Sequence, residues 1–513
     1  MELEKKNVKS TLTSKEIDQN TLLNTNYLSK EYELPEFGVN TETEKRKKVI
    51  ATLQSYVETW QAKLKETLNQ TDEGDARLVV YGSFSMDVSA KDGDLDTLLV
   101  APDYVERDKH FFGSFLEKLR ESKEITELQA IKDAYVPLIK LKISSIMVDI
   151  VFARVNRKEL KPDMNFTENL LREMDAEMIR SINAYRTGKK ILELVPDIEN
   201  FQTTLRAIKL WARRKAIYYN SQGFFSGISC AILTAKICKQ YPELKPVDLI
   251  YAFFKTFAFW PWQEKPVVID DNQLSSRPNV ILAEKSWTEN DKSYMMVITP
   301  VYPFSNTTFN VSYITWRVII RHIEEAYRLL EECRQEGKPY NWDSLFEPYE
   351  FFRNYIHFLE VRIFSNNSEQ FLKWKGLIEA RLKVLTRNLE VIPRASDFSE
   401  DQSRITIHPY PFPIQLKESQ DFQHCYAYYY GIKMTNALST HYSKKMDLTQ
   451  PVQDFVHQEI IHKRMEMPDC QIAFLHLTRE ELPNSVFGTE ERPPWATKHM
   501  RYGDRYANGN KLT

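Results

Sequence analysis

The sequence predicts an α+β protein of several domains: a small mixed sheet with helices, a helical central domain, and a C-terminal domain of strands and helices. The chain has 513 residues, of which 42% are hydrophobic, and this is enough for two or three separate cores. Short apolar runs bounded by turn residues lie between residues 78 and 155. Helical periodicity then dominates up to about residue 323, and strand patterns return after residue 355.

A charged amino-terminal region precedes the first sheet. Residues 1–35 are polar with scattered leucines, which predicts a loose arm and one short helix. From Thr43 to Asn69 apolar residues recur at helical spacing, namely Val49, Leu53, Val57 and Trp60. Four basic residues, 45–48, open this helix. They could be a nuclear import signal, but such a run is more often a solvated helix face.

The most informative stretch runs from Leu78 to Pro102. An apolar strand leads into Gly82-Ser83, a polar loop follows, and Asp94-Leu95-Asp96 opens a second strand. Side chains two residues apart on a strand share one face, so both carboxylates point the same way. Like charges this close need a cation, or one of them must stay protonated. Hard divalent ions such as Mg²⁺ suit carboxylate and phosphate oxygens.

A third carboxylate, Asp149, lies in the apolar strand from Met147 to Val155. An unpaired charge in a buried strand is costly, and the same metals would stabilise it. Three carboxylates could hold a pair of ions that clamp an in-line displacement at phosphorus. A lone DxD is weak evidence, and a lone acid in a strand is often an edge residue. The combination is what indicates a metal site.

The other segments of this module predict a small mixed sheet. Val105 to Arg120 is expected to be an amphipathic helix, with its inward side formed by Phe111, Phe115 and Leu119. Val136–Ile143 and Met147–Val155 are expected to be antiparallel strands joined tightly at Ser144-Ser145. We therefore expect helices on one side of the sheet and the acids along one edge of it.

The mainly helical region that follows carries the clearest basic patch. Residues 201–242 contain no Asp or Glu but seven Lys or Arg. Such a patch is often a solvated helix face, yet its position just after the acids suits a triphosphate held between them. Lys209 offers a point charge for phosphate oxygens. Tyr218 offers a hydroxyl and a ring, and Asn220 has the donor and acceptor that a base edge requires.

The C-terminal third predicts the element order β-α-β-β-α-β. The expected segments are Tyr355–Ile363, Ser368–Ile392, Arg404–His408, His424–Met434, Pro451–Met465 and Cys470–Leu477. This is the order of the ferredoxin-like fold, which RNA-recognition domains use. Tyr426 and Tyr428–Tyr430 could stack bases, although packing is the more common role of strand tyrosines. The ending, from Pro483 to Thr513, is expected to be irregular.

Composition narrows the class of protein further. The formal net charge is −2, so any RNA-binding surface must be local. The five cysteines form no CxxC pair, which indicates a reducing compartment and no structural zinc. The charged amino terminus has no apolar core, so we expect no secretory signal. The most apolar window, Leu249–Trp262, is too short to span a membrane, and no membrane association is expected.

The Gly-Ser turn, the DxD and the later Asp resemble the nucleotidyltransferase superfamily of polymerase-beta type. Four stretches also resemble the nuclear-type poly(A) polymerases of eukaryotes: SINAYRTGKKILELVP, LRAIKLWARRKAIYYN, ITPVYPFSNTTFNVS and LKWKGLIEARLKVLTRNLE. The likeness runs in order from about Glu36 to about Leu389. It implies an arm and helix packing on the central domain (1–42), a nucleotidyltransferase domain (43–196), a helical central domain (197–346), an RRM-like RNA-binding domain (347–482) and a tail (483–513).

The resemblance also implies a function and a site. The chain would add AMP from ATP to RNA 3′ ends without a template, releasing pyrophosphate. Two Mg²⁺ or Mn²⁺ ions would be held by Asp94, Asp96 and Asp149. The nucleotide would be contacted by these acids and by Tyr81, Gly82, Ser83, Leu95, Lys209, Tyr218, Asn220, Gly227 and Ile228, the last two closing over the adenosine.

The resemblance extends to the setting of the reaction, and two alternatives stay open. It implies mRNA 3′-end processing in the nucleus, by a monomer that works with cleavage and polyadenylation factors. The first alternative is a terminal uridylyltransferase or another RNA nucleotidyltransferase. The second is an RNA-binding scaffold with a dead site, which the intact acids argue against.

Three positions depart from the family pattern. Asp87 and Asp92 stand where glycines are usual, and Ser226 stands where the family often has Gly. Asp tolerates left-handed backbone angles better than most residues, so the loop can keep its shape. Two added negative charges near a triphosphate could still weaken nucleotide binding or alter the metal preference.

Overall fold

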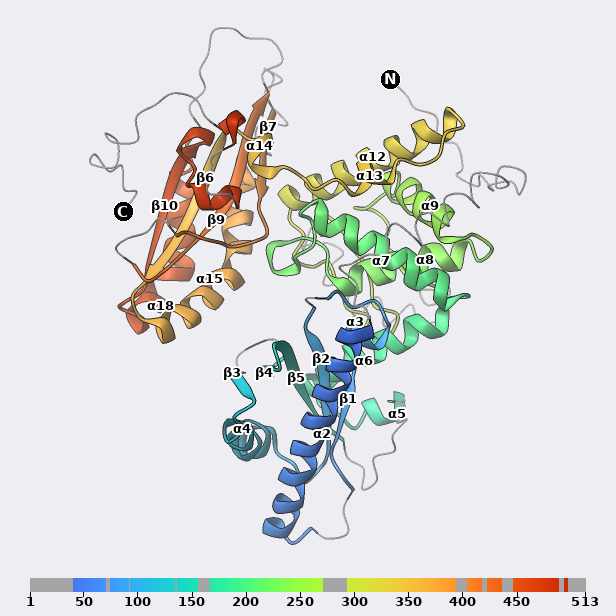
Figure 1. Ribbon diagram of the computed structural model, residues 1–513, viewed down its shortest axis with the longest axis vertical. Helices are drawn as coiled ribbons and strands as arrows, with labels where there is room; N and C mark the ends of the chain where they lie inside the picture. The colour runs from blue at the N-terminus through green and yellow to red at the C-terminus, as the bar shows by residue number, and fades with distance from the viewer. Residues whose placement is uncertain are drawn as a thin grey trace.

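The computed structural model describes residues 40–70, 74–91, 93–132, 134, 136–155, 166, 168–270, 293–393, 404–417, 422–435, 446–488 and 493–496. Within them the chain forms three bodies in sequence order: a sheet with helices, a helical body, and a second sheet with helices (Figure 1). The expected amino-terminal arm, residues 1–35, and most of the expected tail lie outside the described residues. The short helix η6 (Arg479–Glu481) precedes the expected tail, whose described part contains the short helices η7 (Asn484–Phe487) and η8 (Pro494–Ala496).

The first body is built on a five-stranded mixed sheet. Its strands are β1 (Arg77–Val80), β2 (Leu95–Pro102), β3 (Ile125–Ile131), β4 (Leu138–Ile143) and β5 (Ile146–Val155), in the spatial order β1-β2-β5-β4-β3. β2 and β5 are parallel, and the other neighbours are antiparallel. The tight turn between β4 and β5 is confirmed, since Ser144 and Ser145 have φ of 50° and 69°, as hairpin turns of the primed kind require. β3 was not predicted, because this edge strand is only partly buried and its polar residues hide the pattern.

Helices cover both faces of this sheet, so the expectation of helices on one side is wrong. One face packs against α2 (Asn40–Leu68), η2 (Arg107–Phe115) and α4 (Leu116–Arg120). The other packs against α5 (Glu168–Leu171) and α6 (Ala176–Leu194). The physical reason lies in β2, where Leu95 and Leu99 are buried on the first face while Leu98 and Val100 are buried on the second. The predicted inward residues of α2 are confirmed as buried, and the helix predicted after Val105 begins as the π-helix η2.

The helical body is built around one hydrophobic core that its long helices share. It comprises α7 (Ile198–Arg214), η3 (Asn220–Gln222), α8 (Gly227–Gln240), α9 (Pro246–Ala258), α12 (Tyr313–Gln335) and α13 (Trp342–Phe346). Asp197 and Ser226 cap the start of α7 and α8 by accepting backbone N–H groups. Trp211 of α7 meets Phe254 of α9 edge to face, with ring centroids 4.8 Å apart. In the part of the chain that the structure describes, no helix combines the length and the apolarity that crossing a membrane requires.

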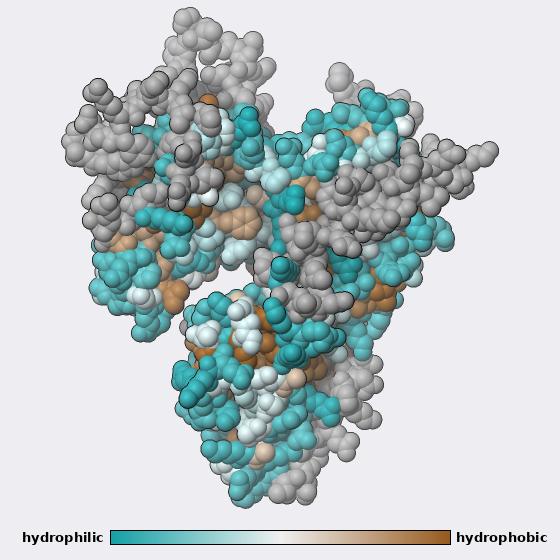
Figure 2. Space-filling model, in the orientation of Figure 1, coloured by the Kyte–Doolittle hydropathy of each residue, from teal (hydrophilic) through white to brown (hydrophobic). Residues whose placement is uncertain are grey.

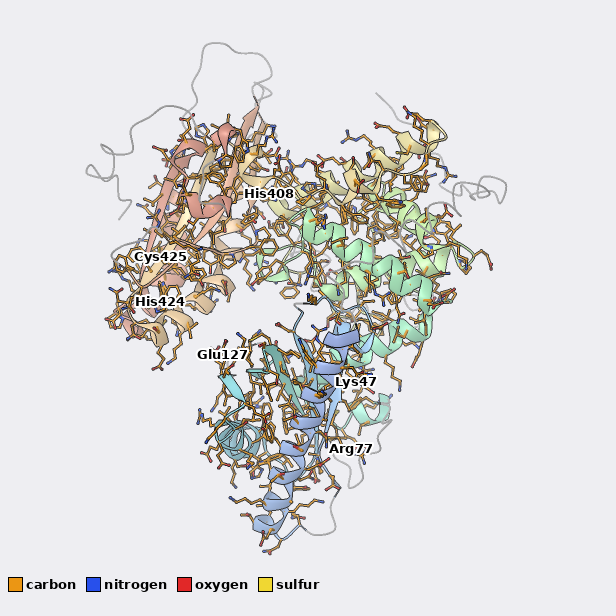
Figure 3. All side chains as sticks on the ribbon, viewed as in Figure 1. Lys47, Arg77, Glu127, His408, His424 and Cys425 are labelled. Atoms are coloured by element: carbon orange, nitrogen blue, oxygen red, sulfur yellow. The ribbon has the colours of Figure 1, made fainter. Side chains whose placement is uncertain are left out.

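The C-terminal body has the predicted order of elements. They are α14 (Phe351–Asn354), β6 (His357–Ser365), α15 (Ser368–Leu389), β7 (Arg404–Pro409), β8 (Ile414–Gln415), β9 (His424–Thr435), α17 (Thr449–Phe455), η5 (Val456–Ile460), α18 (Ile461–Glu466) and β10 (Gln471–Thr478). The four long strands pair antiparallel in the order β10-β6-β9-β7. Counting those strands along the chain, the spatial order is 4-1-3-2, that of a ferredoxin-like sheet. Figure 3 marks His408 on β7 and the start of β9 at His424 and Cys425.

Both faces of this second sheet are covered. Tyr428 and Tyr430 are buried against α15 and α17 on one face. Tyr429 is buried on the other face beside Phe351 and Phe352 of α14. The prediction that these strand tyrosines pack in the core, rather than stack bases, is therefore confirmed for the three of them. Tyr426 is half-buried.

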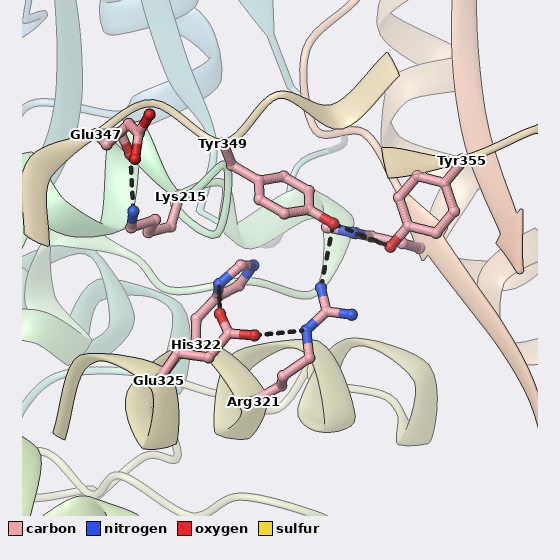
Figure 4. Close-up of polar contacts among 8 residues, drawn as sticks. Lys215, Arg321, His322, Glu325, Glu347, Tyr349 and Tyr355 are labelled. Carbon is pink, nitrogen blue, oxygen red and sulfur yellow. Dashed lines mark hydrogen bonds and ion pairs between the residues drawn. The ribbon is translucent and has the colours of Figure 1, made fainter. Parts of the chain in front are cut away.

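A polar network ties the helical body to the C-terminal body (Figure 4). Arg321 of α12 donates to the Tyr349 hydroxyl at 3.3 Å, and Tyr349 bonds the Tyr355 hydroxyl at 3.3 Å. Tyr355 bonds Nδ1 of the fully buried His408 at 2.8 Å. On the helical side, His322 bonds Glu325 at 3.0 Å. A chain of hydrogen bonds therefore connects the two bodies. Tyr355 and His408 in this chain are buried from water.

Candidate active site

The three predicted acids meet on one face of the first sheet. Asp94 directly precedes β2, Asp96 is the second residue of β2, and Asp149 lies on β5. Because β2 and β5 are parallel neighbours and Asp96 is in register with Asp149, the carboxylates stand side by side. We expected the acids along an edge of the sheet. They belong to two of its inner strands instead. On the same face of these strands, the residues that follow the acids are apolar and buried.

The site carries more negative charge than its own cations balance. Burial, followed by the charges of Asp149 and Asp94, raises the pKa of Asp96 to about 7. Burial also raises the pKa of Asp149, although Lys140 opposes that shift. The Lys140 ammonium lies 3.2 Å from Asp94 Oδ2 and 3.4 Å from Asp149 Oδ1, so it bridges two of the three acids.

Lys140 is a site residue that the sequence reasoning missed. The signal was available, because the tight turn at Ser144-Ser145 fixes the register of the hairpin. Ile143 then pairs with Ile146, and counting three residues outward pairs Lys140 with Asp149. A lysine opposite a buried acid across a strand pair is an expected partner.

The donor set suits hard divalent cations. Oδ1 of Asp149 is buried and accepts no well-directed hydrogen bond, and Asp96 faces two like charges, which Lys140 and Lys209 oppose less strongly. These are conditions that a bound divalent ion would relieve. Among the residues described, no three His, Cys, Asp or Glu side chains already stand close enough to enclose a metal. The carboxylates would therefore have to draw in around an ion.

The Gly-Ser turn reaches the acids through its backbone. Gly82 opens the short helix α3 (Gly82–Ser85) with φ of +72°, and a Cβ there would lie 2.1 Å from Asp96 Oδ2. Only glycine fits this approach. Ser83 follows in the same turn, and Tyr81 before it is buried, with its backbone N–H donating to Asp96 O at 3.0 Å. Leu95 is buried on the opposite face, so only its backbone is available to a ligand.

The loop after α3 turns at Asp87. Asp87 has φ of +55°, a left-handed angle that Asp tolerates better than most residues. Its carboxylate pairs with Arg206 at 3.1 Å, and Arg206 also bonds the Asp87 carbonyl. The negative charge of Asp87 is therefore paired with a cation of the helical body. Asp92 lies outside the described residues.

Lys209 is brought close to the acids, but it is already engaged with the backbone. It is buried on α7, and its Nζ donates to the Val88 carbonyl at 2.7 Å. Burial, followed by the positive charge of Arg213, lowers the pKa of Lys209 to about 8. The negative charge of Asp96 raises the pKa of Lys209, and the positive charge of Lys209 lowers the pKa of Asp96. The two side chains therefore interact electrostatically.

Tyr218, Gly227 and Ile228 lie together beyond α7. Arg213 lies over the Tyr218 ring, 5.5 Å from its centroid. A Cβ on Gly227 would lie 2.9 Å from the Tyr218 hydroxyl, so the absence of a side chain there lets the hydroxyl approach α8. Ile228 is half-buried against the central core. Ser226 caps α8 in a reciprocal pair with Ser229.

Asn220 is held in one orientation by its neighbours. Its Nδ2 donates to the Thr307 carbonyl at 3.1 Å, and its Oδ1 accepts from Asn310 Nδ2 at 2.7 Å. Lys383 of α15 in turn donates to Asn310 Oδ1 at 3.4 Å. Asn310 is a second residue that the sequence reasoning missed; it lies within a family-like stretch, but nothing in its spacing pointed to Asn220.

The space-filling view shows the surface hollowed between the first body and the C-terminal body (Figure 2). α3, with the Gly-Ser turn, lies beside α6 and α8 (Figure 1). The acids thus belong to one body, and Lys209, Tyr218 and Asn220 belong to the next. A ligand between them would touch both bodies.

Comparison with known proteins gives the family. Models of the poly(A) polymerase nucleotidyltransferase domain, central domain and predicted RNA binding domain match residues 13–195, 200–348 and 350–397. Nuclear poly(A) polymerase 1 of Arabidopsis thaliana is 30% identical over 467 residues, which cover 89% of this chain and 63% of that protein. Poly(A) polymerase of Dictyostelium discoideum is 31% identical over 509 residues, which cover 96% of this chain and 60% of that protein. The chain thus spans about three fifths of the length of these relatives.

Among solved structures, one of Cid1, an RNA terminal uridylyltransferase, matches 62% of this chain and 96% of its own with 19% identity and a TM-score of 0.44. A likeness of that size decides nothing about the nucleotide used. The three domain models match in sequence order and together cover most of the chain. This chain belongs to the poly(A) polymerase family.

Proposed function

We propose that the chain is a template-independent poly(A) polymerase, which transfers AMP from ATP to the 3′ end of RNA. The observation that carries the proposal is the meeting of Asp94, Asp96 and Asp149 on one face of the sheet, with more negative charge than Lys140 balances. Family membership makes adenylyl transfer the first candidate for the use of such a site.

In this reaction the RNA 3′-oxygen attacks the α-phosphorus of ATP. The new O–P bond forms as the bond from the α-phosphorus to the bridging oxygen breaks, pyrophosphate leaves, and the hydroxyl proton passes to solvent. Two divalent ions, Mg²⁺ or Mn²⁺, on the three acids would lower the pKa of the hydroxyl and neutralise charge on the pyrophosphate. The remaining work of the protein is positioning.

The proposed nucleotide contacts come from two bodies. Gly82 and Ser83 offer backbone and hydroxyl groups to the phosphates, next to Tyr81 and the backbone of Leu95. From the other side, Lys209 supplies a cation, and a pKa of about 8 keeps most of it protonated at neutral pH. Tyr218 would contact the nucleotide and Asn220 the base, with Gly227 and Ile228 closing over the adenosine.

We also propose the biological setting that the family suggests. The substrates are an RNA 3′ end and ATP, and the partners are the factors of mRNA 3′-end cleavage and polyadenylation. The Arabidopsis thaliana relatives are named nuclear poly(A) polymerases, which supports a nuclear location. We propose a monomer, with the domain boundaries 43–196, 197–346 and 347–482.

The test of nucleotide choice is extension of a short RNA primer with each NTP alone and then with all four together, in Mg²⁺ and in Mn²⁺. A ladder with ATP that persists in the mixture supports adenylyl transfer. A preference for UTP keeps the chemistry and turns the assignment to uridylyl transfer. Failure with every nucleotide and both metals, by protein that binds the primer, would make the chain an RNA-binding scaffold.

A further inference from the structure

Arg46 does not behave like the other members of the basic run in which it lies. Lys45, Lys47 and Lys48 are exposed on α2, whereas the Arg46 side chain is only 2% exposed. Neither an import signal nor a solvated helix face accounts for a guanidinium withdrawn from water, because burial of a charge is costly unless hydrogen bonds compensate.

The Arg46 guanidinium is directed into the loop that leads to the acids. Its Nη2 donates to three carbonyl oxygens, those of Ala90 at 2.9 Å, Lys91 at 3.2 Å and Gly93 at 2.8 Å. Its Nη1 donates to Ser89 Oγ at 2.9 Å. The last of these carbonyls belongs to the residue immediately before Asp94. One side chain of α2 therefore holds four of the described residues that lead to the DxD.

Arg46 also contacts the other half of the site. Its guanidinium carbon lies 5.9 Å from the centroid of the Phe84 ring, and Phe84 follows Gly82-Ser83 in α3. The planar fork of arginine can reach several acceptors and a ring at once, which an ammonium cannot do with the same geometry. The single side chain links the Gly-Ser turn to the strand of the acids.

The first part of the same loop is held from the helical body. Gln202 donates to the Met86 carbonyl at 3.0 Å, and Lys209 donates to the Val88 carbonyl at 2.7 Å. Arg206 bonds Asp87 between them. Successive carbonyls of the loop are thus occupied by α7 at its start and by Arg46 at its end. The end held by Arg46 is the one that is continuous with the acids.

We propose that Arg46 is a positioning residue: by fixing residues 89–91 and 93 it sets the place of the Asp94 and Asp96 carboxylates relative to Asp149, and hence their geometry toward divalent metal. The activity part of this inference rests on the proposed adenylyl transfer, but the metal-binding part does not. Residues that orient metal ligands change metal affinity by about 10–100-fold when they are lost.

The experiment uses the full chain in four forms: wild type, Arg46→Lys, Arg46→Ala and Lys47→Met. Arg46→Lys keeps the charge and can satisfy fewer of the carbonyls, so the fold is retained more readily than in Arg46→Ala. Lys47 lies one residue along α2, labelled in Figure 3, and is exposed in a pair with Glu44 at 2.9 Å. Mn²⁺ affinity is measured by titration without nucleotide, and cooperative thermal unfolding confirms the fold of each form.

We expect Arg46→Lys to weaken Mn²⁺ binding by about tenfold or more, with kcat for primer extension reduced more than KM for ATP changes. Addition of millimolar guanidinium to Arg46→Ala should restore part of the Mn²⁺ affinity, which a merely structural role would not produce. Lys47→Met should match wild type in each assay. Wild-type Mn²⁺ affinity in folded Arg46→Lys would overturn the inference. If instead wild type bound Mn²⁺ but extended no primer, only the proposed function would fail.

Discussion

Gly82 shows how closely the backbone approaches the reacting groups. A methyl group at this position would have to occupy the space of an Asp96 carboxylate oxygen, and its backbone angle is itself unfavourable for other residues. Gly376, on α15, has no atom within 4 Å of an added Cβ and lies in a helix where alanine is favoured.

We therefore predict that Gly82→Ala lowers kcat by about 10²-fold or more, because it displaces a carboxylate of the site. Gly376→Ala is the matched control and should leave activity unchanged while raising stability by about 0.5–1 kcal/mol. Primer extension and urea unfolding measure the two effects. Equal activities in the two variants would show that the approach of Gly82 to Asp96 has no catalytic consequence.

Asn310 lends itself to a second prediction at the level of the residue. It fixes the amide of Asn220, which we propose faces the base, by a hydrogen bond of 2.7 Å. Asn310→Ala should reduce the preference for ATP over UTP by about tenfold, since lost polar partners weaken discrimination more than they weaken binding. Ratios of kcat/KM for the two nucleotides measure this. A proportional loss for both nucleotides would assign Asn310 a general structural role.

At the scale of elements, the junction of α12 with β7 carries two buried histidines. Burial lowers the pKa of His322, and burial together with the charge of Arg321 lowers the pKa of His408 well below its ordinary value. In the unfolded chain the pKa of both histidines would be about 6.5. The unfolded state therefore binds more protons below that pH, so the stability due to the neutral histidines is full above about 6.5 and declines as the pH falls.

We predict that the urea midpoint of the wild type falls between pH 7.5 and pH 5, and that His408→Gln shows a smaller fall. His457→Gln, at an exposed position on η5, is the control and should keep the wild-type slope. If the urea midpoint of His408→Gln fell with pH as steeply as that of the wild type, this junction would not be the cause of the lower stability at acid pH.

Elements with a clear periodicity of apolar residues or a clear turn signal were predictable from the sequence. Elements whose structure depends on tertiary contacts were not. The apolar spacing of α2 and the hairpin at Ser144-Ser145 follow from local rules, and both are confirmed. β3 was missed because an edge strand buries little of its surface. The π-helical start at Arg107 was also missed, because its hydrogen bonds carry no signature that sequence periodicity detects.

The same distinction holds for the candidate site. The acids could be brought together from strand spacing, and Lys140 could have been added from the hairpin register. The burial of Arg46 could not be foreseen, because a basic run at the start of a helix does not show which member turns inward. Its partners lie more than forty residues away, and only the packing of α2 on the sheet brings them together.

At the scale of the whole molecule, both faces of β9 are covered by other elements in the part of the C-terminal sheet that the structure describes. The Tyr429 hydroxyl donates to the fully buried Glu360 at 2.8 Å. Tyr429→Phe should therefore cost about 1–3 kcal/mol of stability, as expected for a buried acceptor that loses its donor. RNA affinity, measured by fluorescence anisotropy, should be unchanged. A large loss of RNA affinity without a loss of stability would contradict the packing role of Tyr429 and would indicate that its ring stacks on RNA bases.

The arrangement of the three bodies puts the acids on one side of the proposed substrates and Lys209, Tyr218 and Asn220 on the other. Relative movement of the first two bodies would then assemble or open the site, with the loop at Asp87 and Val88 as their shared contact. Selection of ATP and placement of the RNA end would depend on that closure.

The proposed adenylyl transfer depends on Asp94, Asp96 and Asp149 as the residues that would hold the divalent ions. The most direct measurement is extension of an oligo(A) primer with ATP by wild type and by Asp149→Ala, each checked for cooperative unfolding and for Mn²⁺ binding. We predict a ladder with wild type, a rate at least about 10²-fold lower in the variant, and weaker Mn²⁺ binding by it. Wild-type extension by a folded Asp149→Ala would contradict the account.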